Sequence, residues 1–301
     1  MRLPEENRER KELRDMFSTN NDSGRFRVVV LSENTLTQEG EEKGLKAEHG
    51  LSLYIENGMN TLLVDAGQSD AFAENARKLG IDLTKVEYAI LSHGHYDHAD
   101  GFDTFFEVNP KAGLYMREEV SENCYSEKAE GIKYIGPKKG MLDKYRERIV
   151  KVDSPHYTID SCNTVLLPHT TEGLAELGAK ARLFKESDGN MVPDDFDHEQ
   201  TLLLNTVKGY VIFNSCSHAG AANILREVRD YLTGDATIYA YIGGFHLMHS
   251  TDEEVREFAE SIRHANVQRL ITGHCTGERA YEILKDELGD CVEMMHVGME
   301  I

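Results

Sequence analysis

Short runs of apolar residues predict several β-strands in the first hundred residues. Three of these runs are rich in valine, leucine and isoleucine, a composition that favours strands. They cover residues 27–31, 51–55 and 61–64. Residues 69–79 instead place Phe72, Ala76 and Leu79 on one face of a predicted helix. A fourth apolar run, 86–91, leads into a polar segment, and active sites of layered α/β proteins commonly lie in such loops after strands.

The second half of the chain alternates predicted strands with amphipathic helices. Residues 202–207 and 210–214 form an expected hairpin that turns at Lys208-Gly209. Further strands are expected at residues 164–167, 237–242 and 269–272, and helices at 221–232, 252–265 and 278–288. By contrast, residues 103–155 are polar and rich in Lys, Glu, Tyr and Gly, and we interpret them as an insertion that covers the site. The pattern as a whole indicates an α/β protein.

The N-terminus differs from the rest of the chain because charges of both signs alternate there without an apolar core. Residues 5–17 are compatible with an exposed helix and equally with a disordered arm, and the polar run 18–24 follows. We therefore expect a charged extension over residues 1–24 and one domain over residues 25–301. Neither a secretory signal nor a membrane span is predicted, because no window approaches about 18 unbroken apolar residues.

Charge and cysteine content narrow the expected partners and compartment. Asp and Glu number 53 against 33 Lys and Arg, a net charge of −20, so neither nucleic acid nor a membrane surface is an expected partner. A small anionic substrate remains compatible, because bound dications reverse the potential inside one cleft. The cysteines are odd in number, widely spaced and without a Cys-x-x-Cys pair, which fits a reducing cytoplasm. They are Cys124, Cys162, Cys216, Cys275 and Cys291.

The segment His93-Gly94-His95-Tyr96-Asp97-His98 contains three of the 13 histidines of the chain. Imidazoles at positions i and i+2 of an extended segment point to the same side, so His93 and His95 can share one ion. Asp97 and His98, on the following bend, can reach a second ion. Such ligands suit zinc, iron, manganese or nickel and leave coordination positions open for water and substrate. The alternative is a surface loop that merely happens to contain these histidines.

Residues 91–98 resemble the signature of the metallo-β-lactamase superfamily. Residues 62–67 resemble the strand and Asp turn that precede this signature, and Thr272-Gly273-His274 resembles a late Gly-His motif. Other segments resemble the branch named for dihydropterin ribofuranosyl-aminobenzene phosphate synthase, namely residues 47–52, 198–200, 215–218, 243–246 and 273–277. The resemblance spans residues 26–301 and implies an α/β fold in which a four-layer αββα sandwich carries the site.

The resemblance also implies which residues bind metal. It assigns His93 and His95 to a first ion, and Asp97, His98 and His274 to a second. Two divalent ions are therefore the expected cofactors, with zinc favoured over iron, manganese or nickel. The same motif makes Asp97 a candidate catalytic residue, because it would face the gap between the ions.

The third ligand of the first ion stays open. His198 lies just before the predicted hairpin, where related members of the superfamily place that histidine. Cys216 stands where many members have a bridging Asp, so the pattern departs there. A Cys216 thiolate could bind one ion, His218 could replace it, or Cys216 could be a small buried residue at a strand end.

Two further residues are candidates for supporting roles. Asp65 follows a predicted strand, where it either fixes a ligand histidine or forms a turn. His246 follows Gly243-Gly244 at another strand end. It is a candidate catalytic residue that binds an anionic group or donates to a leaving oxygen, and the alternative is a hydrogen-bonded structural histidine.

A two-metal centre is suited to activating water and polarising the bond under attack. The sequence contains neither a Gly-x-Ser-x-Gly elbow nor a Gly-rich phosphate loop, which disfavours Ser-triad hydrolysis and nucleotide-dependent phosphoryl transfer. We therefore predict a cytoplasmic metal-dependent hydrolase acting on a small anionic ester, phosphoester or lactone. The branch resemblance implies a second option, a pterin-forming synthase. A third is a non-hydrolytic redox or sensor protein, although di-iron electron-transfer members typically have Glu where this chain has His95.

Overall fold

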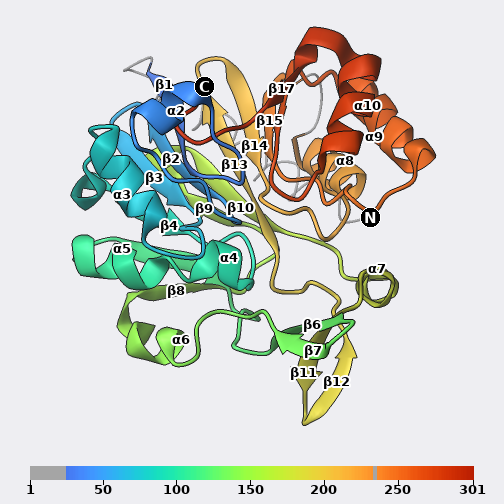
Figure 1. Ribbon diagram of the computed structural model, residues 1–301, viewed down its shortest axis with the longest axis horizontal. Helices are drawn as coiled ribbons and strands as arrows, with labels where there is room; N and C mark the ends of the chain where they lie inside the picture. Colours follow the sequence, from blue (N-terminus) through green and yellow to red (C-terminus); the bar gives the residue numbers. More distant parts are fainter. Residues whose placement is uncertain (1–24, 233–235) are drawn as a thin grey trace, which may run out of the picture.

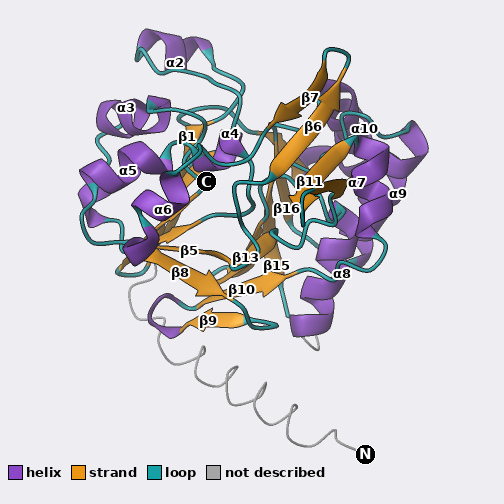
Figure 2. Cartoon of the chain, turned by 90° about the horizontal axis from the view of Figure 1, so that it is seen from below, coloured by secondary structure: helices purple, strands orange, loops and turns teal. Residues whose placement is uncertain are grey.

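The computed structural model describes residues 25–232 and 236–301, and it consists mainly of two β-sheets that face each other with helices on both outer sides (Figures 1 and 2). The expected extension over residues 1–24 lies outside the described residues. Within the described ranges, no helix is long and apolar enough to cross a membrane.

The first sheet has six strands in the order β1-β2-β3-β4-β5-β8. Strands β1, β2 and β3 are antiparallel, whereas β3, β4, β5 and β8 run parallel. The strands are β1 (Phe26–Ser32), β2 (Ser52–Asn57), β3 (Asn60–Val64), β4 (Tyr88–Ile90), β5 (Gly113–Arg117) and β8 (Ile149–Val152). Both faces of β1 are buried, with Val28 and Val30 toward the second sheet and Val29 and Leu31 toward the helices, which explains its continuous apolar sequence.

The second sheet has seven strands in the order β17-β16-β15-β14-β13-β10-β9. Its antiparallel part, β9-β10-β13-β14, joins a parallel part, β14-β15-β16-β17. The strands are β9 (Tyr157–Ile159), β10 (Thr164–Pro168), β13 (Gln200–Thr206), β14 (Gly209–Phe213), β15 (Ile238–Gly243), β16 (Arg269–Thr272) and β17 (Val292–Met294). Because parallel strands end at one edge, the loops after β14, β15 and β16 lie side by side.

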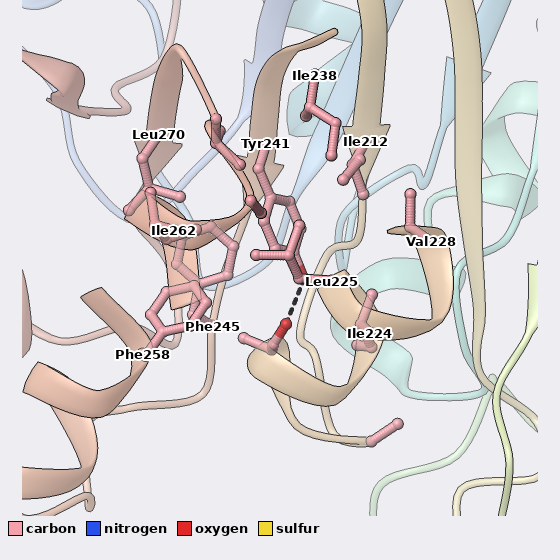
Figure 3. Close-up of a cluster of buried hydrophobic side chains, with 14 of the residues drawn as sticks. Ile212, Ile224, Leu225, Val228, Ile238, Tyr241, Phe245, Phe258, Ile262 and Leu270 are labelled. Atoms are coloured by element: carbon pink, nitrogen blue, oxygen red, sulfur yellow. Dashed lines mark hydrogen bonds between the residues drawn. The ribbon is translucent and has the colours of Figure 1, made fainter. Parts of the chain in front are cut away.

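Apolar side chains fill the spaces between the layers. One cluster lies between the two sheets and includes Leu53 and Phe213. The helices form the outer layers and pack through two further clusters, one on each sheet. They are α2 (Gln38–Glu42), α3 (Ala71–Lys78), α4 (Tyr96–Ala99), α5 (Phe102–Val108), α6 (Met141–Lys144), α7 (Leu174–Ala181), α8 (Ala221–Leu232), α9 (Asp252–His264) and α10 (Glu278–Leu288). Figure 3 shows Tyr241 of β15 against Phe245 and Phe258 in the cluster beneath α8 and α9. The prediction of a four-layer αββα sandwich is confirmed.

A small third sheet, in the order β12-β11-β6-β7, extends beyond the sandwich (Figure 1). It consists of two hairpins, β6 (Cys124–Lys128) with β7 (Gly131–Tyr134), and β11 (Leu183–Ser187) with β12 (Asn190–Pro193). Pairing of β11 with β6 joins the hairpins. These strands are short, β7 and β12 are largely exposed, and β6 and β11 are only partly buried, so their sequences lack the apolar pattern that predicts buried strands.

The structure refines the insertion expected over residues 103–155. Helix α5 and strands β5 and β8 of that segment belong to the sandwich, because β5 and β8 pair within the first sheet. Only the part between them, with β6, β7 and α6, leaves the sheet. The strands β5 and β8 escaped prediction because each has only five or four residues and carries Arg or Lys.

Candidate metal centre

The histidine-rich segment lies at the end of β4 and turns into α4, a helix of four residues for which His95 is the N-cap. His93, His95, Asp97 and His98 are all buried. A surface loop with incidental histidines is therefore excluded, because polar side chains are buried only where they have partners or a function.

Three other side chains reach the same region from the ends of parallel strands. His218, His246 and His274 follow β14, β15 and β16, respectively. The residues Asp65, Ser217, His246 and His274 have positive φ angles of 56°, 54°, 49° and 48°, a backbone conformation that is uncommon for non-glycine residues. Such conformations concentrate at functional sites, where the surrounding structure maintains them.

The first group of potential ligands consists of the imidazoles of His93, His95 and His218. Their ring centroids are 4.6 Å apart for His93 and His95, 4.9 Å for His93 and His218, and 4.8 Å for His95 and His218. The Nε2 atoms of His93 and His95 and both ring nitrogens of His218 are buried and have no hydrogen-bond partner among the described residues. Unpartnered nitrogens in one buried place are costly, and an ion bound there would satisfy three of these four, one from each ring.

The second group consists of Asp97, His98, His274 and Cys216. Asp97 Oδ2 lies 3.5 Å from His98 Nε2 and 3.4 Å from His274 Nε2. The two Nε2 atoms are 3.2 Å apart, and Cys216 Sγ lies 3.3 Å from His98 Nε2. The candidate sets in this region overlap, with ligand atoms within 4.8 Å of one another in each set. Cys216 lies with His93 and His98 in one set and with His274 and Cys275 in another, and Asp97 lies with His49 and His274 in a third.

Hydrogen bonds orient three of these imidazoles with Nε2 toward the site. His98 Nδ1 donates to Asp65 Oδ2 at 2.8 Å, because a carboxylate only accepts. Ser92 Oγ also donates to Asp65 Oδ2, so it accepts from His93 Nδ1 at 2.9 Å. Asn34 Oδ1, which accepts from Gly50 N, accepts from His274 Nδ1 as well, at 3.1 Å. The Nε2 atoms of His93 and His98 therefore present lone pairs, the arrangement that metal-binding histidines require. Burial alone would lower the pKa of His274, but the contact of its Nε2 with Asp97 raises this pKa to about 9, so an ion would have to displace the proton on that nitrogen.

Protonation supports the same interpretation. Burial, followed by the neighbouring imidazoles, holds the pKa of His93 and of His218 well below the usual range, and burial lowers the pKa of His95 to about 3. These side chains are neutral near pH 7 and can donate lone pairs. Burial alone would raise the pKa of Asp97, but His98, His274 and His49 outweigh it and hold this pKa well below its ordinary value. Asp97 is therefore an anion.

His198, expected near the first ion, has other contacts. Its Nδ1 accepts from the backbone N–H of Gly94 at 3.1 Å, and its Nε2 lies 3.1 Å from Asp194 Oδ2 and 3.7 Å from Cys124 Sγ. Its ring centroid is 6.2 Å from that of His93, farther than the ring of His218. The ring of His198 lies 5.5 Å from that of His95, so the ring of His218 is the nearer of the two to both His93 and His95.

Two histidines lie at the margin of the site. His246 is partly exposed, and its ring centroid lies 4.6 Å from that of His218. His49 Nε2 lies 3.2 Å from Asp97 Oδ2, and 53% of the His49 side chain is exposed. Its ring also lies near that of His274, with centroids 4.8 Å apart. The sequence offered little reason to single out His49, because these contacts join segments far apart in the chain.

Comparison with known proteins agrees with this geometry. The chain is 27% identical over 288 residues to the 7,8-dihydropterin-6-methyl-4-(β-D-ribofuranosyl)-aminobenzene-5′-phosphate synthase of Methanocaldococcus jannaschii, and the alignment covers 91% of this chain and 95% of that relative. The crystal structure of Tm1679, a metal-dependent hydrolase of the β-lactamase superfamily, matches with a TM-score of 0.78 and 31% identity over 92% of this chain and 98% of its own.

More distant structures share the fold. The metallo-β-lactamase fold protein YhfI from Bacillus subtilis matches with a TM-score of 0.54 and 12% identity over 92% of this chain and 98% of its own. The family model of the metallo-β-lactamase superfamily matches residues 45–274, which includes the segment from His93 to His98 and ends at His274. Since this match spans most of the chain, the protein belongs to the metallo-β-lactamase superfamily.

Proposed function

We propose that this protein is a hydrolase in which two divalent metal ions activate water against a small anionic ester, phosphoester or lactone. The observation that supports this most is the convergence of buried side chains in two adjacent groups, several of whose nitrogens have no partner among the described residues. Seven potential ligands are too many for one tetrahedral ion.

The first ion would be held by His93, His95 and His218. All three are neutral donors, so this position would keep the full charge of a dication and at least one open coordination site. The spacing of their rings, 4.6 to 4.9 Å, is compatible with three imidazoles around one ion.

The second ion would be held by Asp97, His98 and His274, with Cys216 as a further ligand. The thiol contacts His98 at 3.3 Å and occupies the region between the two groups. A set of nitrogen, oxygen and sulfur donors suits zinc best, and a cation at this position would favour the thiolate form of Cys216. Iron, manganese or nickel remain alternatives for the imidazole-rich first position.

Two such ions, when bound, supply acidity that makes water a nucleophile near neutral pH and polarise the bond under attack. The ionised carboxylate of Asp97 orients the attacking water by accepting its hydrogen bond. His246, partly exposed beside His218, donates to the oxygen of the leaving group. The described strand ends exclude bulk water from the inner side of the site, because His93 and His98 have no exposed surface.

An anionic substrate follows from the charge balance. Asp97 and a Cys216 thiolate would neutralise only half of the charge of two dications, so the centre would attract an anion even though the chain carries a net charge of −20. We expect neither nucleic acid nor membranes to be partners, because that overall charge repels both, and we expect the protein to act in the cytoplasm.

Metal content together with hydrolysis tests this proposal. Protein purified without chelators should contain about two metal equivalents. Chelation should abolish hydrolysis within a panel of phosphodiester, thioester and lactone substrates, and zinc should restore it. His218→Gln should lose about one equivalent, whereas the control His264→Gln, on the exposed surface of α9, should lose none. A protein that contained no transition metal and gained none on reconstitution would contradict the proposal.

A second candidate function is a synthase that forms a pterin derivative. It is favoured by the relative in Methanocaldococcus jannaschii, which this chain matches over nearly its whole length. If metal binds but the substrate panel is inert, condensation of a dihydropterin with a phosphoribosyl compound is the reaction to assay. The same two groups of ligands would serve it. A redox or sensor role would instead require metal-dependent electron transfer or ligand binding without turnover.

A further inference from the structure

We infer that His198 and Asp194 do not bind an ion but position the Gly94 peptide, and thereby hold His93 and His95 in place for the first ion. The inference rests on the proposed function, because it concerns the geometry of that metal position. The superfamily resemblance predicts instead that His198 is a metal ligand. The contacts of the two ring nitrogens of His198 support a positioning role.

Hydrogen bonds determine which ring nitrogen of His198 carries the proton. The N–H of Gly94 donates to His198 Nδ1 at 3.1 Å, so this nitrogen carries no proton and its lone pair is already used. In a neutral imidazole the proton then resides on Nε2, which donates to Asp194 Oδ2 at 3.1 Å. Neither nitrogen has a lone pair left for an ion. His98 shows the opposite arrangement, with Nδ1 donating to Asp65 and Nε2 directed toward the site.

A separate metal site at His198 is not supported by its contacts. Potential ligand atoms of His95, Cys124, Asp194 and His198 lie within 4.8 Å of one another and are all buried, which resembles a separate metal site. The Nε2 proton of His198 points into this cluster, toward Asp194, and would have to be displaced. Cys124 Sγ also contacts His198 Nε2, at 3.7 Å. The existing hydrogen bonds therefore already account for His198 and Asp194.

Backbone contacts fix the position of Asp194. Its Oδ1 accepts from the N–H of Phe196 at 2.8 Å, and its backbone N–H donates to Leu183 O at 3.0 Å. Gly178 of α7 packs so closely that a Cβ there would lie 2.1 Å from Asp194 O. The carboxylate is thus fixed at the base of the small sheet, and His198 transmits this position to Gly94.

The same short segment also contacts the third imidazole. The ring of Phe196 stacks on that of His218, with centroids 4.9 Å apart and an angle of 14° between the planes. Phe196 has a positive φ of 52°, and it lies between Asp194, which contacts His198, and His198, which contacts Gly94. Residues 194–198 therefore position all three imidazoles of the first group, two through the Gly94 peptide and one through stacking.

Nuclear magnetic resonance of protein labelled with 15N-histidine and loaded with 113Cd tests this directly. We expect cadmium–nitrogen coupling at His93, His95 and His218, and none at His198. The 15N shifts of His198 should show a proton on Nε2 and none on Nδ1, in metal-free and loaded protein alike. Coupling at His198, or a proton on its Nδ1, would overturn the inference. Failure to bind cadmium or zinc at all would instead contradict the proposed function.

Variants add a second measurement. His198→Ala should still bind two zinc equivalents at saturation, but with about 10- to 100-fold weaker affinity for the first ion. His198→Asn retains an acceptor for the Gly94 N–H and should recover part of that loss. The matched variant His218→Ala should lose one equivalent even at saturation. If His198→Asn or His198→Ala lost a full equivalent while His218→Ala kept both, His198 would be the ligand and the inference would be wrong.

Discussion

Asp65 Oδ2 lies 2.8 Å from His98 Nδ1, and neither side chain has any exposed surface. Asp65 also accepts from the backbone N–H and the hydroxyl of Ser92, each at 2.7 Å. One carboxylate thus orients a ligand of the proposed second ion and fixes the start of the signature loop. The alternative that Asp65 only forms a turn does not account for these contacts.

Asp65→Asn should weaken binding of the second ion about 10- to 100-fold, because an amide has one acceptor oxygen and cannot serve all three donors. Asn tolerates the positive φ of 56° at this position, so the backbone should be preserved. Competition with a calibrated chelator measures the affinity. The control Asp82→Asn, at the N-cap of the 3₁₀ turn Leu83–Lys85, should leave both affinities unchanged. Equal affinities in Asp65→Asn and the unmodified protein would refute the role of Asp65.

Asp97→Asn should reduce kcat by a factor of about 100 or more while the first ion remains bound. Asp97 is the carboxylate of the second group, and Asn has the same shape without the charge. The substitution should therefore weaken binding of the second ion and orient the attacking water less well. Each loss of about 1.4 kcal/mol in transition-state stabilisation reduces the rate tenfold. The measurement is kcat on an active substrate, with metal content determined in parallel.

Asp100→Asn is the matched control for Asp97→Asn. Asp100 is the C-cap of the same short helix, but its carboxylate accepts from the N–H of Lys138. We expect its kcat to stay within a factor of about three of the unmodified value, roughly 0.6 kcal/mol. Near-normal kcat in Asp97→Asn with both ions bound would exclude the water-activating role assigned to Asp97.

Much of the sandwich was predictable because burial imposes a period on each element. Helices α8 and α10 have the expected bounds, and β1 and β16 lie within a residue or so of theirs. The small sheet was not predicted, because β7 and β12 are exposed and β6 and β11 are only partly buried, so the polarity of these strands does not distinguish them from loops. Local sequence could identify the motif from His93 to His98 because its ligands are close in the chain.

The choice between His198 and His218 could not be made from sequence. Both lie close to β13 or β14, and their spacing fits either role. Our proposal of His218 depends on Gly94, which donates to His198 from a position 104 residues away, and on Phe196, which stacks on His218. Such contacts join residues far apart in the chain and produce no periodic pattern in the sequence.

Gly101→Ala should destabilise the fold strongly, by about 3 kcal/mol or more, because a Cβ at Gly101 would lie 1.9 Å from the backbone oxygen of Ala66. The N–H of Gly101 also donates to Gly67 O at 3.1 Å, and a shift of the Gly101 backbone that relieved the clash would strain this hydrogen bond. Urea unfolding measures the change. The control Gly80→Ala has a positive φ of 74° but open space around its Cβ, so only the conformational cost of about 1 kcal/mol is expected. Similar losses of unfolding free energy in both variants would show that the close approach of Gly101 to Ala66 does not determine the effect.

Asp103→Asn should lower stability at pH 7 by roughly 0.5 to 1 kcal/mol, an effect that acid removes. The carboxylate accepts from Lys138 Nζ at 2.7 Å, Lys144 Nζ at 2.6 Å and Tyr145 Oη at 2.7 Å, and these bonds hold the pKa of Asp103 well below its ordinary value. A depressed pKa in the folded state stabilises the protein above the unfolded-state pKa of about 3.9 and loses that contribution as pH falls further. The difference in unfolding free energy between the two proteins should therefore be constant from pH 7 to about pH 5 and shrink below about pH 4.

Urea unfolding at each pH measures this difference. Loss of bound ions in acid affects both proteins equally and cancels. Salt at about 1 M should also reduce the difference, because the lysines are exposed. The control Asp143→Asn, whose partner Arg146 is likewise exposed, should change stability little at any pH. A difference that persisted unchanged to pH 3 would show that Asp103 acts through packing and not through its charge.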